Sequence, residues 1–121
     1  MSDPVRSVSS EVVQIYGTWE GGGSSATTKL RGDGWTIATG AGSGVYTITI
    51  TGDLPHYELV SFVADLHADA PGDVDTYSAH LDWNASSSSS LVFTLSEAGT
   101  PTDLAADEYM SFIAVFKDSA V

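Results

Sequence analysis

Hydrophobic and polar residues alternate along most of the chain from Val12 onward, with the period of two that is typical of half-buried β-strands. The clearest run is 45–51, in which Tyr46, Ile48 and Ile50 share one face while the intervening residues, mostly threonines, share the other. The same alternation predicts further strands at 12–20, 28–30, 35–39, 59–67, 77–83, 91–95 and 110–116. Seven or eight strands are therefore expected.

The phase of the alternation predicts which side chains point into the core. The inward set expected in the strand at 59–67 consists of Val60, Phe62, Ala64 and Leu66. In the strand at 77–83, Trp83 completes the apolar face. Trp19 and Trp35 also occupy the apolar phase of their strands, so burial is the favoured interpretation for all three tryptophans.

Glycine, serine and proline separate these strands. Five residues, 40–44, join the strands at 35–39 and 45–51, which predicts a β-hairpin. The runs 21–25 and 86–90 are glycine-rich or serine-rich and are interpreted as flexible loop tips. The segment 102–110 offers the one helical alternative, and because it spans barely two turns we expect at most one short helix.

These elements predict an all-β fold: an antiparallel β-sandwich, a jelly-roll-like fold or a small barrel of about seven to eight strands. The 121 residues fit one core, so 12–121 is expected to form a single domain. Residues 1–11 are small and polar with Pro4 near the start, which is typical of an extended N-terminal arm.

Charge narrows the range of partners. Sixteen acidic residues against four basic ones give a formal net charge of −12. Nucleic acid and anionic membranes are disfavoured, because binding to either depends on Lys and Arg. The sequence shows no secretion signal and no apolar run of membrane-spanning length, and it contains no cysteine.

Candidate chemistry is sparse. The residues considered as metal ligands are His56, His67 and His80, and a calcium loop at Asp69, Asp73 and Asp75. Neither set has the spacing of a known metal motif, so no metal site and no cofactor is expected. The RGD tripeptide at 31–33 is interpreted as a simple turn. The sequon at 84–86 matters only for a chain that enters a eukaryotic secretory pathway, for which nothing in the sequence argues. No nucleophile motif such as GxSxG occurs, so the chain is predicted not to be an enzyme.

Two long segments carry a resemblance to known proteins. The first is GDGWTIATGAGSGVYTITITGDLPHYELVSFVADL and the second is MSFIAVFKDSAV at the end of the chain. Both resemble a family of small β-rich proteins encoded by tailed bacteriophages, in which an aromatic strand, a glycine link, a GxYTVTL-like strand, a turn and a strand with an (L/V)xSxxAxL pattern recur before a late strand ending in lysine. Here those elements are 34–39, 44–50, 59–66 and 111–117.

The resemblance implies a virion protein, specifically a decoration or cement protein that binds the major capsid protein on the capsid surface, often as a trimer. It implies manufacture in the host cytoplasm and no catalytic residues. Docking requires a patch or arm, and the residues expected to supply it are Pro4, Val5, Arg6 and Val8. Such an arm could pair with an exposed sheet edge of the shell protein or of a neighbouring subunit.

A rival prediction from another class is a phage tail or fibre module that binds host surface carbohydrate through exposed aromatic residues and loop tips. Two observations separate the alternatives: where the protein sits in the particle, and whether replacing one tryptophan abolishes glycan binding.

Overall fold

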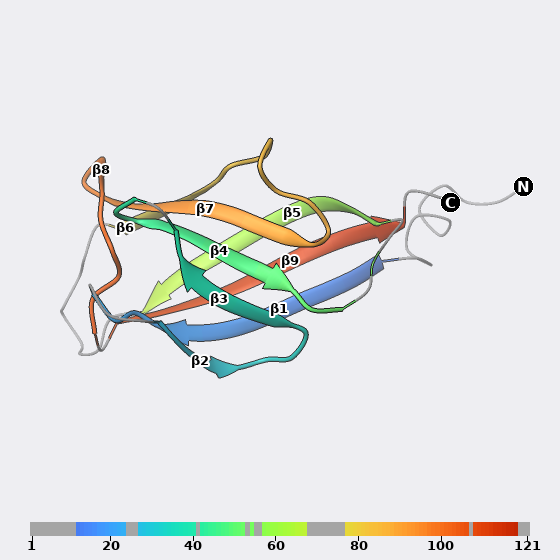
Figure 1. The fold of residues 1–121 in the computed structure, drawn as a ribbon, viewed down its shortest axis with the longest axis horizontal. Coiled ribbons are helices and arrows are strands. Elements are labelled where there is room, and N and C mark those ends of the chain that lie inside the picture. Colours follow the sequence, from blue (N-terminus) through green and yellow to red (C-terminus); the bar gives the residue numbers. More distant parts are fainter. Residues whose placement is uncertain are drawn as a thin grey trace, which may run out of the picture.

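The computed structural model describes residues 12–23, 27–40, 42–52, 54, 57–67, 77–106 and 108–118. Within them, nine strands form two antiparallel sheets that pack face to face (Figure 1). The four-stranded sheet has the order β2-β1-β9-β5 and contains β1 (Val12–Glu20), β2 (Thr28–Arg31), β5 (Tyr57–His67) and β9 (Tyr109–Asp118). The five-stranded sheet has the order β3-β4-β7-β6 and contains β3 (Trp35–Thr39), β4 (Val45–Ile50), β6 (Tyr77–Leu81) and β7 (Ser90–Glu97), with β8 (Thr100–Pro101) beside β7.

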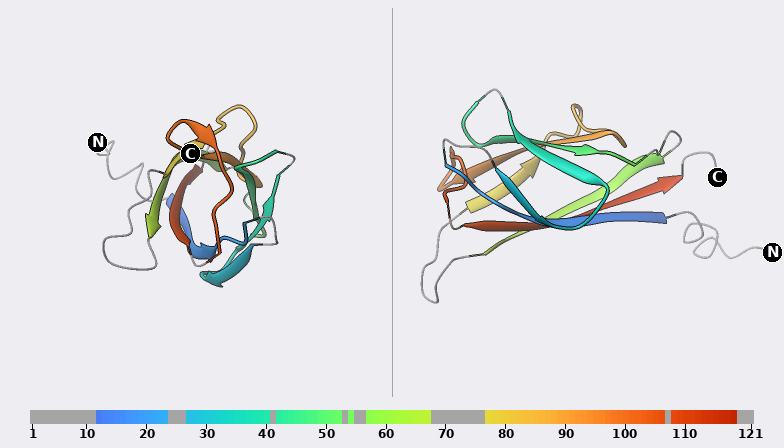
Figure 2. Two further views of the ribbon diagram at one scale, coloured as in Figure 1. Left: turned by 90° about the vertical axis from the view of Figure 1, so that its left-hand side faces the viewer. Right: turned by 60° about the horizontal axis from the view of Figure 1, so that its bottom comes forward.

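The predicted β-sandwich is confirmed, and seen end-on the two layers enclose a common interior (Figure 2). The structure has one strand more than the seven or eight expected. The additional strand is β8, which is only two residues long. The predicted hairpin is also present, because β3 and β4 pair from Trp35 opposite Ile50 to Thr39 opposite Tyr46. None of the described residues forms a helix, so the helical alternative at 102–110 is not used.

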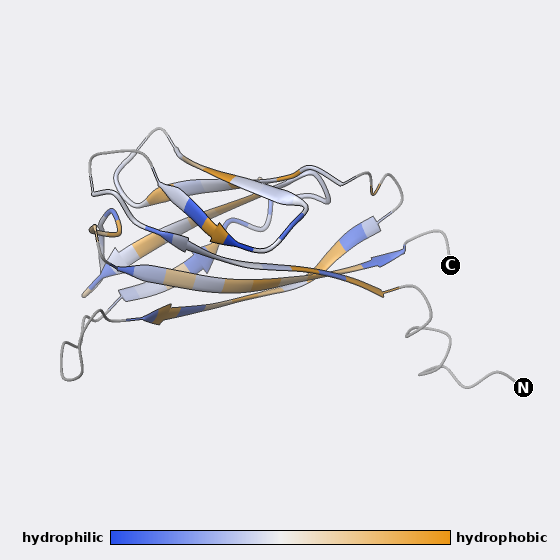
Figure 3. Ribbon diagram, turned by 90° about the horizontal axis from the view of Figure 1, so that it is seen from below, coloured by the Kyte–Doolittle hydropathy of each residue, from blue (hydrophilic) through white to orange (hydrophobic). Residues whose placement is uncertain are grey.

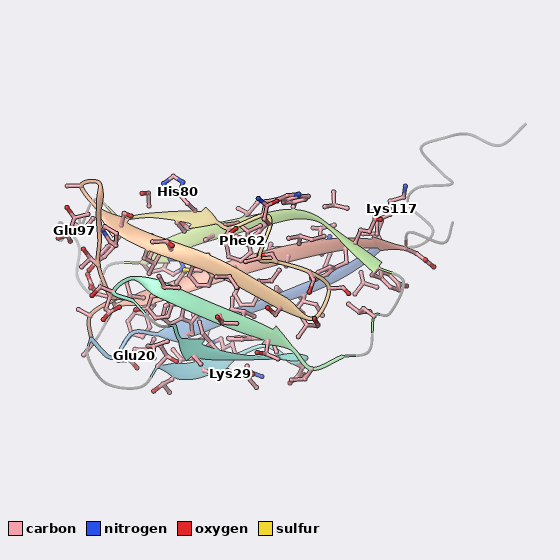
Figure 4. All side chains as sticks on the ribbon, turned by 45° about the horizontal axis from the view of Figure 1, so that its top comes forward. Glu20, Lys29, Phe62, His80, Glu97 and Lys117 are labelled. Atoms are coloured by element: carbon pink, nitrogen blue, oxygen red, sulfur yellow. The ribbon has the colours of Figure 1, made fainter. Side chains whose placement is uncertain are left out.

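The core lies between the sheets and is built around aromatic side chains (Figure 4). Phe62 reaches inward from β5, and its ring lies 5.5 Å from that of Phe93 in the opposite sheet and 6.0 Å from that of Phe112 in β9. Trp19 stands 4.8 Å from Tyr46, again between sheets. Each such pair adds about 0.5–1.5 kcal/mol beyond burial, and the Phe62–Phe93 and Trp19–Tyr46 pairs link the two sheets.

The end of the sandwich near Glu20 and Tyr109 is closed by the segment 102–106. Leu104 of this segment is buried in the core, and its backbone N–H donates to the hydroxyl of Tyr46 at 2.8 Å. Asp103 accepts a hydrogen bond from the N–H of Gly44 at 2.7 Å. The backbone of this segment is held by side-chain and loop contacts, which explains why it does not coil into a helix.

Burial raises the pKa of the Tyr46 hydroxyl above its ordinary value of 10.0. The nearby Asp103 carboxylate raises this pKa further, because a second negative charge is disfavoured beside it, whereas the hydrogen bond from Leu104 lowers it. The neutral hydroxyl is therefore the form that this closed end accommodates.

Hydrophobic and polar bands alternate along the strands (Figure 3), with one interruption in β5. A β-bulge between Leu59 and Ser61 inserts an extra residue opposite β9. Leu59 consequently faces the core together with Phe62, and Val60 is exposed. The predicted inward position of Val60 is thus wrong, because simple alternation cannot anticipate a bulge that reverses the phase.

Candidate functional site

The outward surface of the four-stranded sheet, called here the outer face, carries a continuous line of apolar side chains. Tyr16 in β1 lies directly opposite Ile113 in β9, and Ile113 lies directly opposite Val63 in β5. Their side chains are 62%, 46% and 61% exposed. Because opposed residues in antiparallel strands have neighbouring Cβ atoms, these three form one apolar row across the sheet.

Polar side chains border the apolar row on one side. Thr18 Oγ1 and Ser111 Oγ, the next outward pair along β1 and β9, are 3.0 Å apart, and His67 Nε2 lies 3.0 Å from the same Ser111 oxygen. On the other side the next outward positions are Gln14 and Val115. An exposed apolar patch with an ordered polar border is typical of a protein contact surface.

The five-stranded sheet presents a different outward surface. Its outward positions include Thr36, Ala38, Val45, Thr47, Thr49, Ser78, His80, Val92 and Thr94. Most of them are hydroxyl-bearing, and His80 projects from β6 into solvent (Figure 4). Since only the outer face of the four-stranded sheet has large apolar residues in register, it is the stronger candidate for binding a partner.

A second candidate site is a groove beside the loop that follows β6. It has a volume of about 320 Å³ and is lined by Tyr57, Glu58, Leu59, Trp83, Ser86, Ser87 and Ser88, a set called here the Trp83 groove. Trp83 is 60% exposed, in contrast to Trp19 and Trp35, which are 0% and 1% exposed. The predicted burial of Trp83 is therefore wrong, because β6 ends at Leu81 and Trp83 lies in the turn beyond it.

The serine run beside Trp83, for which composition predicts a flexible tip, makes several hydrogen bonds to the residues around it. Ser86 Oγ donates to the carbonyl of Asp82 at 2.8 Å and accepts from the N–H of Val92 at 3.0 Å. Ser88 Oγ donates to the carbonyl of Leu54 at 2.9 Å, and the carbonyl of Ser89 accepts from the N–H of Ile50 at 2.9 Å. The serine run is therefore hydrogen-bonded to the residues on either side of it in sequence and to Ile50 and Leu54.

The sequence-predicted docking residues Pro4, Val5, Arg6 and Val8 lie outside the described residues, and so do His56, Asp69, Asp73 and Asp75. The described chain starts where Val12 pairs with Lys117, at the end of the sheet that also holds Glu58. His67 and His80 lie in different sheets and do not converge. Among the residues that the structure describes, no three His, Cys, Asp or Glu side chains gather as a possible metal site.

The RGD tripeptide starts at the last residue of β2 and continues into the turn that links β2, at the edge of one sheet, to β3, at the edge of the other. Gly32 has a φ of 98° there, and a Cβ at this position would collide with the carbonyl of Tyr16. The glycine is therefore required for packing of the turn. The sequon at 84–86 lies in the turn that carries Trp83.

No helix in the described part of the chain is long and apolar enough to cross a membrane. Comparisons of the chain with protein-family models, curated proteins and solved structures gave no match. The fold and the two surfaces thus define a β-sandwich with an exposed apolar sheet face and a small groove at an exposed tryptophan.

Proposed function

We propose that this chain is a structural virion protein that decorates the outer surface of a tailed-phage capsid by binding the major capsid protein. The observation that carries this proposal is the apolar row of Tyr16, Ile113 and Val63, which a strongly acidic domain leaves exposed. Exposed apolar surface of this kind is used for contacts between proteins. The resemblance of two long segments to structural proteins of tailed phages favours the capsid as partner.

The net charge of −12 supports the same role. The negative charge opposes nonspecific aggregation before assembly, and it opposes binding to the packaged genome. The proposed activity is binding alone, without catalysis or a cofactor, by a protein made in the host cytoplasm and located on the capsid surface.

Trimeric assembly is part of this proposal, because a trimer matches the local threefold positions of an icosahedral shell. The arm at 1–11 is proposed to add to the docking through Pro4, Val5, Arg6 and Val8. Light scattering on the purified protein determines whether it is a trimer. The docking arm is tested by deleting residues 2–10 and measuring binding to particles, and unchanged binding would count against it.

The outer face is tested by replacing both Tyr16 and Ile113 with Thr, which keeps the β-propensity of the strands. We expect the double variant to remain folded and to lose at least about tenfold in affinity for capsids, measured by co-sedimentation with shells of the encoding phage. Trp83→Thr is the matched control, because it removes an equally exposed aromatic residue away from the outer face. Wild-type binding by the double variant would contradict the proposed docking surface.

A second candidate function is a tail or fibre module that binds host surface carbohydrate, and the exposure of Trp83 favours it. The two functions differ in location. A decoration protein is present in many copies on the head, including the heads of tailless particles, whereas a tail module is lost with the tail. Quantitative mass spectrometry of intact and tailless particles separates them.

A further inference from the structure

We propose that the Trp83 groove is a binding site for a neutral saccharide. The inference deepens the second candidate function by assigning its site and ligand class. The position of the protein in the particle tests that function separately from the binding measurements below. The groove is distinct from the apolar row, because Tyr16, Ile113 and Val63 do not line it, although β5 of the same sheet contributes one wall.

Trp83 provides an exposed aromatic surface on a hydrogen-bonded turn. Its turn is closed by the N–H of Ala85, which donates to Asp82 Oδ1 at 3.2 Å, and by the N–H of Ser86, which donates to the Trp83 carbonyl at 3.3 Å. The face of an indole ring carries partial negative charge. The C–H groups on one side of a pyranose ring carry partial positive charge, so a sugar ring packs on this face while its hydroxyls point elsewhere.

Two polar side chains of the groove offer acceptors to a ligand. Ser88 Oγ uses its proton on the Leu54 carbonyl, which leaves its lone pairs for a ligand. Glu58, which also lines the groove, is exposed and adds a carboxylate. A ligand that matches this arrangement brings several hydrogen-bond donors together with a C–H surface, and a saccharide has both.

Size and charge narrow the ligand further. A volume of about 320 Å³ lies at the small end of the range for ligand pockets, about 300–1,000 Å³, which suits one or two sugar rings. A stable protein–protein interface covers about 800 Å² on each partner, so the size of the groove suits a small ligand better than a protein. The net charge of −12 disfavours anionic sugars such as sialic and uronic acids. The expected ligand is a neutral hexose or N-acetylhexosamine oligosaccharide.

The rigidity of the loop favours binding as well. Ser86 and Ser88 are tied to strands or segments on both sides of the run, so the groove does not need to become ordered when a ligand enters. Preorganisation of this kind lowers the entropic cost of binding.

Tryptophan fluorescence provides an intrinsic probe of ligand binding. Trp19 and Trp35 are buried and Trp83 is exposed, so a neutral quencher such as acrylamide reports mainly on Trp83. The full chain is first applied to an array of neutral hexose and N-acetylhexosamine oligosaccharides beside sialylated and uronic-acid glycans. Neutral glycans that bind are then titrated, and we expect shielding of Trp83 from acrylamide with a dissociation constant at or below about 1 mM.

Variants assign the site. Trp83→Ala is expected to lower saccharide affinity at least about tenfold, and Glu58→Gln about fivefold, because Gln keeps one acceptor but loses the charge. Binding is followed by calorimetry, since Trp83→Ala lacks the fluorescent probe. Tyr16→Thr, on the outer face, is the matched control and should bind saccharide as the wild type does.

Four results would each overturn the assignment. They are the absence of any neutral glycan on the array that shields Trp83, undiminished binding by Trp83→Ala, binding confined to anionic glycans, and shielding of Trp83 by a proline-rich peptide where saccharides give none. Far-UV circular dichroism checks that each variant is folded. We expect Trp83→Ala to fold because Trp83 is exposed.

Discussion

The hydroxyl of Tyr46 accepts a hydrogen bond from the backbone N–H of Leu104 at 2.8 Å, joining β4 to the segment that closes one end of the sandwich. The two residues are 58 positions apart in sequence, and both side chains are fully buried. A backbone donor in such a place has no access to water, so the tyrosine hydroxyl is its replacement partner.

Replacement of Tyr46 with Phe should therefore destabilise the protein by about 1–3 kcal/mol, because the Leu104 N–H is left buried without an acceptor. The free energy of unfolding, measured by denaturant titration, checks this value. Tyr16→Phe is the control, since Tyr16 is exposed and its loss of a hydroxyl should change stability by less than about 0.5 kcal/mol. Equal stability of the two variants would show that the contact contributes nothing.

The raised pKa of Tyr46 predicts that the protein loses stability in alkali. Burial, helped by Asp103, raises the pKa of Tyr46 in the folded protein above the value of 10.0 expected in the unfolded chain. The contribution of the neutral Tyr46 hydroxyl to folding stability is complete below pH 10. It is lost as the pH rises from there through the folded pKa, because the unfolded state releases the proton first. A phenyl ring cannot ionise, so the difference in stability between wild type and Tyr46→Phe should shrink above pH 10. A difference that is independent of pH would contradict the assignment.

The bulge in β5 predicts opposite outcomes for two adjacent apolar residues. Leu59 packs against the core and Val60 is exposed. Leu59→Thr should cost about 1–3 kcal/mol of unfolding free energy, whereas Val60→Thr should change it by less than about 0.5 kcal/mol. Chemical denaturation of both variants measures the difference. If Val60→Thr were the more damaging, uninterrupted alternation would be correct and the bulge would be absent.

Alternation predicted most of the fold because each strand buries one face. Tyr46, Ile48 and Ile50 point inward as expected, and the hairpin of β3 and β4 follows from the short glycine link. The position of Val60 was not predictable in this way, since a bulge depends on pairing with β9 and leaves no mark in the period of β5 itself.

The candidate sites were less accessible to sequence reasoning. Tyr16 has the outward phase in its own strand, but the apolar row exists only because β1, β9 and β5 are neighbours, and strand order cannot be read from alternation. Trp83 has the phase of β6 but lies two residues beyond its end. The polar sequence after Trp83, Asn84 and then a serine run, was the available signal that the strand stops.

The serine run offers the sharpest contrast between composition and structure, and its order can be measured directly. Ser86→Ala removes both the donor to the Asp82 carbonyl and the acceptor for the Val92 N–H, so we expect a loss of about 1–3 kcal/mol and faster hydrogen exchange at Val92. Ser78→Ala is the control, because Ser78 is exposed on β6 and contacts only His80 through its hydroxyl among the hydrogen bonds described. A flexible loop would leave the Val92 amide exchanging rapidly already in the wild type, and the Trp83 groove would then lack the rigid wall that saccharide binding requires.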